Sequence, residues 1–107
     1  MERRSFERFS MNLFATYDQS RFSKGLEAMT NNVSLKGACI LTEKKLKPQK
    51  NIKLKLFFGP QISPKEMNST VVYSKPVEDK LERGYLSGIE FSDLIFKDKE
   101  ELLQNGL

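Results

Sequence analysis

The stretch NIKLKLFF, residues 51–58, decides the fold class of this chain. Its apolar side chains stand at every second position: Ile52, Leu54, Leu56 and Phe58. Lys53 and Lys55 lie between them, so one face of the segment is apolar and the other is charged. A repeat of two residues is typical of a β-strand with one buried face. Gly59-Pro60 then ends the strand, because proline cannot donate to a ladder of backbone hydrogen bonds.

The same alternation recurs on both sides of this strand. It predicts five more strands, over Met11–Tyr17, Gly25–Thr30, Ala38–Thr42, Met67–Lys75 and Arg83–Phe91. Six short strands at even spacing usually close into a barrel or a sandwich, which also removes exposed sheet edges. We therefore expect a mainly β domain of one of these two architectures.

The pattern changes after Phe91. Asp98-Lys99-Glu100-Glu101 resembles a capping box, in which a side chain and a backbone amide hydrogen-bond reciprocally at the start of a helix. Leu102 and Leu103 follow it and supply an apolar face. We expect a short carboxy-terminal helix that frays at Asn105-Gly106.

The composition restricts the function. A chain of 107 residues has room for one compact domain. Eighteen Lys and Arg against fourteen Asp and Glu give a formal charge of +4, which favours anionic partners. Histidine is absent from the sequence, so the usual general base, the Ser-His-Asp arrangement and most zinc sites cannot be built. We expect a binding protein with no catalytic residues, no metal and no cofactor.

The amino terminus predicts where the protein is found, and the single cysteine limits its chemistry. Residues 1–9 are charged from the second position and lack the apolar core of a signal peptide, so we expect a cytoplasmic protein with no membrane insertion. Cys39 has no partner for an intrachain disulfide. Its apolar neighbours predict a buried thiol that acts as a small apolar group.

Two polar features are not explained by folding alone. The first is the arginine segment Arg3-Arg4-Ser5-Phe6-Glu7-Arg8, and the second is the stretch Asn32–Gly37, which we expect to lie in a turn spanning Asn31–Gly37. A guanidinium group pairs with phosphate oxygens or with the O6/N7 edge of guanine, and it stacks on bases. The arginines therefore suggest a ligand that carries guanine or phosphate.

These two features together resemble the signature of the PilZ family of cyclic di-GMP receptors. The family has an Arg-x-x-x-Arg segment followed by Asp/Asn-x-Ser-x-x-Gly, which correspond here to Arg4–Arg8 and Asn32–Gly37. Gly37-Ala38-Cys39-Ile40 is similar to the strand after the family's turn, and Ser87–Phe91 to its late Gly-apolar-x-Phe strand. The resemblance covers most of the chain.

The resemblance implies a fold and a division of the chain. It implies a six-stranded antiparallel β-barrel with a flexible amino-terminal arginine segment that wraps over the ligand, and a short carboxy-terminal α-helix beside the barrel. The whole chain, residues 1–107, would be a single PilZ domain. Within it, residues 1–10 would be the wrapping segment, 11–91 the barrel, and 92–107 the helix and tail.

The resemblance also implies roles for six residues. Arg4 and Arg8 would bind guanine Hoogsteen edges and phosphates of cyclic di-GMP. Asn32 would accept a hydrogen bond from a guanine N–H, and Ser34 would offer its hydroxyl to a guanine or a phosphate. Gly37 would adopt a positive φ or let the ligand lie against the main chain. Arg3, directly before the motif, would imply that the domain binds two stacked messenger molecules instead of one.

The function implied is that of a receptor that changes conformation on binding cyclic di-GMP and, as an adaptor, regulates a separate protein partner. One alternative is a degenerate PilZ module that binds a protein without the nucleotide. Another is a small barrel that binds single-stranded nucleic acid through the basic stretch Lys44–Lys55, although those lysines suit the solvated face of an edge strand better. Nucleic acid is therefore the less favoured partner.

Overall fold

The computed structural model of the chain describes residues 6–77 and 84–106. Seven strands and one helix follow one another along them. The first four strands are β1 (Phe9–Ser10), β2 (Phe14–Asp18), β3 (Leu26–Val33) and β4 (Gly37–Thr42). The remaining elements are β5 (Asn51–Leu56), β6 (Lys65–Pro76), β7 (Tyr85–Phe91) and α1 (Lys99–Gly106).

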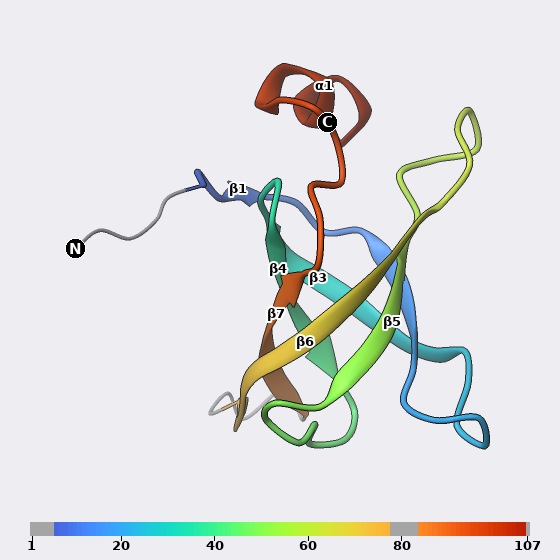
Figure 1. The fold of residues 1–107 in the computed structure, drawn as a ribbon. Helices are drawn as coiled ribbons and strands as arrows, with labels where there is room; N and C mark the ends of the chain where they lie inside the picture. Colours follow the sequence, from blue (N-terminus) through green and yellow to red (C-terminus); the bar gives the residue numbers. More distant parts are fainter. Residues whose placement is uncertain (1–5, 78–83, 107) are drawn as a thin grey trace.

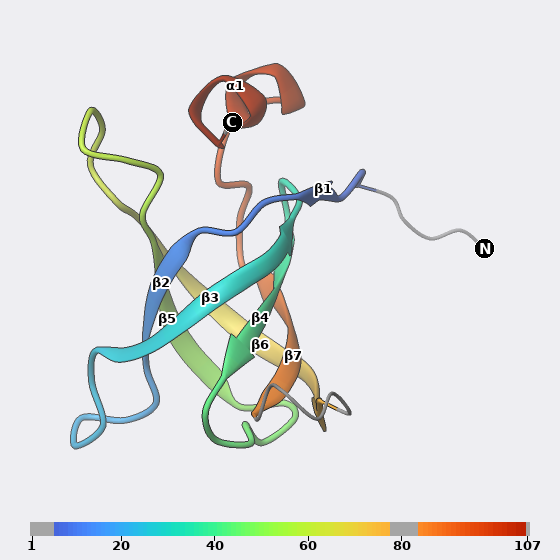
Figure 2. The same cartoon turned by 180° about the vertical axis from the view of Figure 1, so that it is seen from behind.

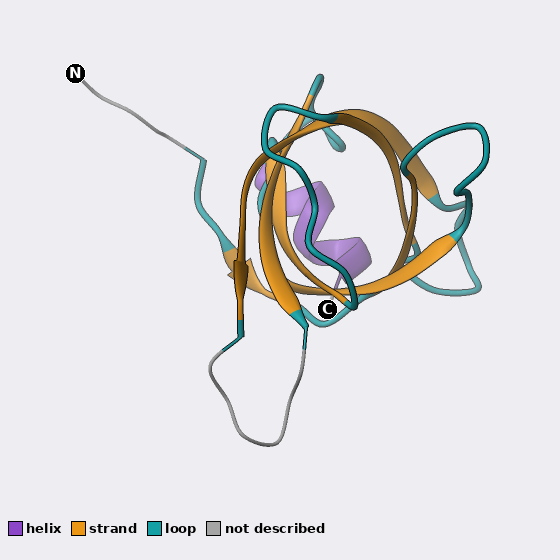
Figure 3. Cartoon of the chain, turned by 90° about the horizontal axis from the view of Figure 1, so that it is seen from below, coloured by secondary structure: helices purple, strands orange, loops and turns teal. Residues whose placement is uncertain are grey.

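Six of the strands close into an antiparallel barrel. Strand β2 pairs with β3 on one side and β5 on the other, and the order continues through β6, β7 and β4. The pairing of β4 with β3 then closes the ring. Figure 3 shows this ring along its axis, and Figure 1 shows α1 at one end of it. The prediction of a mainly β fold with a short helix is confirmed, and the architecture is a barrel.

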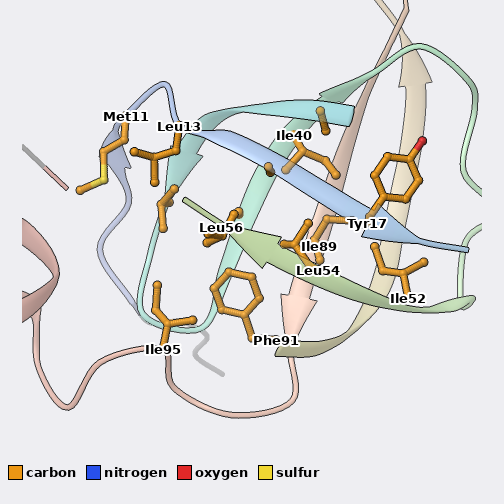
Figure 4. Close-up of a cluster of buried hydrophobic side chains, with 14 of the residues drawn as sticks. Met11, Leu13, Tyr17, Ile40, Ile52, Leu54, Leu56, Ile89, Phe91 and Ile95 are labelled. Atoms are coloured by element: carbon orange, nitrogen blue, oxygen red, sulfur yellow. The ribbon is translucent and has the colours of Figure 1, made fainter. Parts of the chain in front are cut away.

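The interior is filled by the residues that the alternation assigned to it. Ile52, Leu54 and Leu56 point inward from β5, and Phe58 packs against the same cluster from beyond the end of that strand. Figure 4 shows several of these side chains meeting inside the barrel. The thiol of Cys39 is buried, as expected. Alternation identifies these residues because burial of apolar surface is the main force that orients a strand.

The first barrel strand begins later than predicted. Met11 and Leu13 are buried as expected, but regular pairing starts only at Phe14. The hydroxyl of the buried Thr30 accepts a hydrogen bond from the Leu13 amide and donates one to the Met11 carbonyl, both at 2.7 Å. The Thr30 side chain thus replaces two backbone partners, and the chain leaves the ladder geometry at this point.

The turn before β4 is shorter than predicted. Asn31, Asn32 and Val33 belong to β3, so the expectation that they lie in a turn is wrong. Asn32 and Val33 pair with β4 on one side and with β1 on the other. Figure 2 shows β1 beside the end of β3, outside the six-stranded ring. These long-range partners extend the strand past the polar residues that locally favour a turn.

Helix α1 lies at the end of the barrel where β1 and the β3–β4 turn are found (Figure 1). The Asp98 carboxylate accepts a hydrogen bond from the Glu101 amide at 3.0 Å, and the Glu101 carboxylate accepts one from the Lys97 amide at 3.0 Å. The cap predicted at Asp98 is therefore confirmed, whereas the return bond of the Glu101 side chain reaches the amide of Lys97. Leu102 is fully buried. In the described part of the chain, no helix is both long enough and apolar enough to cross a bilayer.

The predicted fraying at Asn105-Gly106 is wrong, because the helix continues to Gly106. The Asn105 side chain donates a hydrogen bond to the Glu101 carbonyl at 2.8 Å and stabilises the last turn. A Cβ on Gly106 would fall 2.5 Å from the sulfur of Met11. The absence of a side chain at Gly106 therefore lets the helix end sit against the segment before β2.

The cap at Asp98 gives a testable prediction for stability. Asp98→Ala removes the acceptor of the Glu101 amide and is expected to lower the free energy of unfolding by about 1 kcal/mol. Glu100→Ala is the matched control, since it removes an exposed carboxylate from the same turn. Urea denaturation of both variants measures the difference. Equal unfolding free energies would show that Asp98 does not cap the helix.

Candidate ligand-binding site

A pocket of about 470 Å³ opens on the outer wall of the barrel. The amino-terminal segment, the β3–β4 turn and strands β6 and β7 meet around it. Its lining residues are Phe6, Arg8, Ser34, Lys36, Gly37, Val72, Tyr73, Gly88, Ile89 and Glu90. The volume lies within the range of small-molecule sites in proteins. Three of the lining residues, Arg8, Ser34 and Gly37, are among those predicted from the sequence.

Arg8 and Asn32 meet at the edge of this pocket. Nη1 of Arg8 donates a hydrogen bond to Oδ1 of Asn32 at 2.8 Å, across a separation of 24 residues. The cause is the pairing of β1 with β3, which sets Ser10 opposite Asn32 and so brings Arg8 alongside. The structure thus joins the two polar features that the sequence shows as separate. Both side chains have donor or acceptor capacity left for a ligand.

Ser34 is placed at the pocket, but its hydroxyl bonds within the turn. The residue is buried, and its Oγ accepts hydrogen bonds from the amides of Gly37 at 3.1 Å and Lys36 at 3.3 Å. The same hydroxyl lies 3.3 Å from the Gly37 carbonyl, to which it donates. Ser34 therefore shapes the turn that presents Lys36 and Gly37.

A positive φ was one of the two reasons predicted for a glycine at position 37. Gly37 does not have a positive φ. The glycines with positive φ are Gly25, Gly59 and Gly84. Gly37 instead begins β4, and a Cβ there would lie 2.5 Å from the backbone oxygen of Ile89. The close approach of β7 therefore requires a glycine at this position, independently of any ligand.

Tyr73 forms an aromatic wall of the pocket that the sequence analysis missed. Strict alternation from the buried Val71 would have turned Tyr73 inward. A bulge between Val71 and Tyr73 shifts the register, so Tyr73 faces outward, opposite Gly88. The pKa of the Tyr73 hydroxyl is raised. Burial is the largest cause, and the contact of the hydroxyl with the Cys39 thiol adds to it, while the nearby charge of Arg8 offsets part of the rise. Gly88 inside a strand was the one sequence signal of a close approach at this place.

The remaining polar residues give the pocket a mixed charge. Lys36 lies in the β3–β4 turn, and its Nζ donates to the Ser92 carbonyl at 3.3 Å. Glu90 is the one acidic residue among the described residues that line the pocket. None of the lysines of the stretch Lys44–Lys55 lines this part of the described surface. Residues 6–77 and 84–106 contain no group of three or more side chains suited to holding a metal ion.

Two of the predicted ligand residues, Arg3 and Arg4, lie outside the described residues. Their predicted contacts with the ligand therefore stay predictions. Glu7, from the same segment, forms a salt bridge of 3.6 Å with Lys99 of α1. The described end of the arginine segment thus contacts both the β3–β4 region, through Arg8, and the helix.

The turn gives a second prediction for stability. Ser34→Ala leaves the buried amide of Gly37 and the partly buried amide of Lys36 without their acceptor and is expected to lower the free energy of unfolding by about 1 to 3 kcal/mol. Ser20→Ala is the control, because Ser20 accepts a similar bond from the Phe22 amide in an exposed turn. Guanidinium denaturation compares the two variants. A loss no larger for Ser34 than for Ser20 would contradict this role.

No curated protein matches the chain. The solved structure of the inhibitor of motility of Bacillus subtilis (MotI/DgrA) superposes with a TM-score of 0.73 at 16% identity, over 97% of this chain and 49% of that one. The chain thus spans about half the length of that protein. The PilZ domain of YcgR from Escherichia coli, solved with cyclic di-GMP, gives a TM-score of 0.69 at 16% identity, over 97% of this chain and 88% of that one.

Both superpositions identify the same barrel fold. The family follows from the sequence itself, because the PilZ domain model matches residues 2–105 and so includes the arginine segment, the β3–β4 turn and all but the last residue of the helix. The members of this family are ligand-binding receptor domains. The chain belongs to the PilZ domain family.

Proposed function

We propose that this PilZ domain is a receptor for cyclic di-GMP and that it regulates a protein partner when the ligand binds. The observation that carries the proposal is the hydrogen bond of 2.8 Å between Arg8 and Asn32. The bond joins the arginine segment to the end of β3, next to the β3–β4 turn, and residues of the segment and of the turn line one pocket, which supports a site made of both. The PilZ domain of YcgR, which has the same fold, was solved with this ligand.

The chemistry of the pocket suits the ligand. Cyclic di-GMP carries two guanines and two phosphate charges on one ring. Arg8 and Lys36 supply positive charge, and the planar fork of Arg8 pairs with a phosphate or with the O6/N7 edge of guanine. Arg4, the first arginine of the Arg-x-x-x-Arg pattern, supplies a second guanidinium to the ligand in this proposal. Asn32 accepts from a guanine N–H once Arg8 turns to the ligand.

The position of the arginine segment supports a regulatory role. The segment contacts the β3–β4 region through Arg8 and the helix α1 through the Glu7–Lys99 pair. Capture of a ligand by Arg8 therefore changes the contacts of a segment that also lies on α1. A partner protein that recognises this end of the barrel would distinguish the bound from the free state. The site performs no catalysis in this proposal, and the protein acts in the cytoplasm, where the messenger is made.

Isothermal titration calorimetry with cyclic di-GMP tests the proposal, with GTP and a single-stranded oligonucleotide as competitors. We expect saturable binding that neither competitor abolishes. Two molecules bound per chain would support the predicted role of Arg3, and one would contradict it. An absence of heat, with the oligonucleotide also inert, would favour a module that binds its partner without the nucleotide. Binding of the oligonucleotide alone would favour a nucleic-acid-binding barrel.

A further inference from the structure

The pocket has an aromatic wall that belongs to neither half of the signature pattern. Tyr73 of β6 stands directly opposite Gly88 of β7. A Cβ on Gly88 would lie 2.3, 2.8 and 2.8 Å from three atoms of the Tyr73 ring. The ring therefore rests on the glycine itself, in the space where any other residue has a side chain.

The ring is held in place and still accessible. Its hydroxyl lies 3.7 Å from the sulfur of the buried Cys39 on β4. With one side against Gly88, the residue keeps 42% of its surface exposed and lines the pocket. Nζ of Lys75 stands 5.5 Å from the ring centroid, and its flexible side chain can move aside for a planar ligand. A fixed ring with an accessible face is the geometry that proteins use to stack a nucleobase.

Glu90 lies on the same face of β7, two residues beyond Gly88. That spacing places the two residues about 7 Å apart along the strand. Glu90 also stands opposite Gly37, and both residues line the pocket. A carboxylate next to a ligand with two phosphate charges is unfavourable unless the ligand offers it N–H donors. Guanine offers two, N1–H and the N2 amino group, on one edge, and a carboxylate can accept both.

We propose that Tyr73 and Glu90 form a guanine subsite, in which the Tyr73 ring stacks on the base and the Glu90 carboxylate accepts from its N1–H and N2–H groups. Gly88 is the positioning residue that sets the height of the ring. The subsite rests on the proposed function, because the base that it binds is one of the two guanines of cyclic di-GMP. It also makes the pocket selective, since adenine presents an acceptor where guanine presents N1–H.

The stacking part is tested by calorimetry with cyclic di-GMP on the full chain. Tyr73→Leu is expected to weaken binding about 10- to 100-fold, whereas Tyr73→Phe keeps the ring and stays within about threefold of the wild type. Gly88→Ala displaces the ring and weakens binding in the presence of Tyr73. The same change in the Tyr73→Leu background adds no further loss, because the two residues act through one contact.

The hydrogen-bonding part is tested by comparing cyclic di-GMP with cyclic di-AMP. Glu90→Gln is expected to weaken binding of the guanine ligand about tenfold and to leave the adenine ligand unchanged, so the preference for guanine falls. Glu66→Gln is the matched control, since Glu66 is an exposed carboxylate on β6 away from the pocket. It is expected to change neither affinity.

The outcomes separate this inference from the proposed function. If the wild type does not bind cyclic di-GMP, the proposed function fails and the subsite fails with it. A second outcome is that the wild type binds and Tyr73→Leu is less stable but binds equally well. The ring then only packs against Gly88, and the stacking role is wrong, while the receptor role stands. An unchanged preference for guanine in Glu90→Gln overturns the part assigned to the carboxylate.

Discussion

Arg8→Ala is expected to weaken the binding of cyclic di-GMP by about 100-fold or more, while leaving the fold intact. The guanidinium joins the described end of the arginine segment to the second half of the signature, through Oδ1 of Asn32. A bidentate pair with guanine contributes about 1 to 3 kcal/mol, and a charge-assisted bond to phosphate adds a similar amount. Calorimetric titration of the wild type and the variant measures the loss.

Two further variants make this result specific. Arg21→Ala removes the same charge from the exposed β2–β3 loop and is expected to change the affinity less than about twofold, since screening by salt weakens distant charges. Arg8→Lys keeps the charge but loses the planar fork, so an intermediate loss of about tenfold is expected. The proposed role of Arg8 is wrong if Arg8→Ala and Arg21→Ala bind equally well.

Phe91→Ala is expected to lower the free energy of unfolding by about 3 to 5 kcal/mol, the range for a fully buried phenylalanine. Phe91 is 1% exposed at the end of β7 and lies in the hydrophobic cluster. Its amide also donates to the Lys36 carbonyl at 2.7 Å, so the core there supports the turn of the pocket. A domain of this size is stable by about 5 to 15 kcal/mol, so the variant would lose a large part of its stability.

Phe22→Ala is the control for this loss, because Phe22 is 88% exposed at the tip of the β2–β3 loop. Its removal is expected to change the unfolding free energy by less than about 0.5 kcal/mol. Denaturation in urea, followed by far-ultraviolet circular dichroism, compares the two variants with the wild type. A loss below about 1 kcal/mol for Phe91→Ala would mean that the core collapses around the missing ring.

Much of the barrel could be predicted because burial follows a local rule. The alternation in residues 51–58 identified the side chains that fill the interior, and the Asp98–Glu101 spacing identified the helix cap. The predictions were wrong where long-range partners decided the outcome. The Thr30 hydroxyl takes the place of a backbone partner for the Met11 carbonyl and the Leu13 amide, and pairing with β1 and β4 extends β3 through Asn32. A single sequence does not reveal which distant segment supplies a hydrogen bond.

The sequence by itself determined the strand faces, the helix cap and the two halves of the family signature, since each depends on residues close together in the chain. Only the tertiary structure decided that Arg8 meets Asn32 and that Tyr73 lies over Gly88. Both depend on strand register, and the bulge between Val71 and Tyr73 reverses the face on which every later residue of β6 stands. Register is set by pairing between strands far apart in the chain, so the pocket exists only once the barrel has closed.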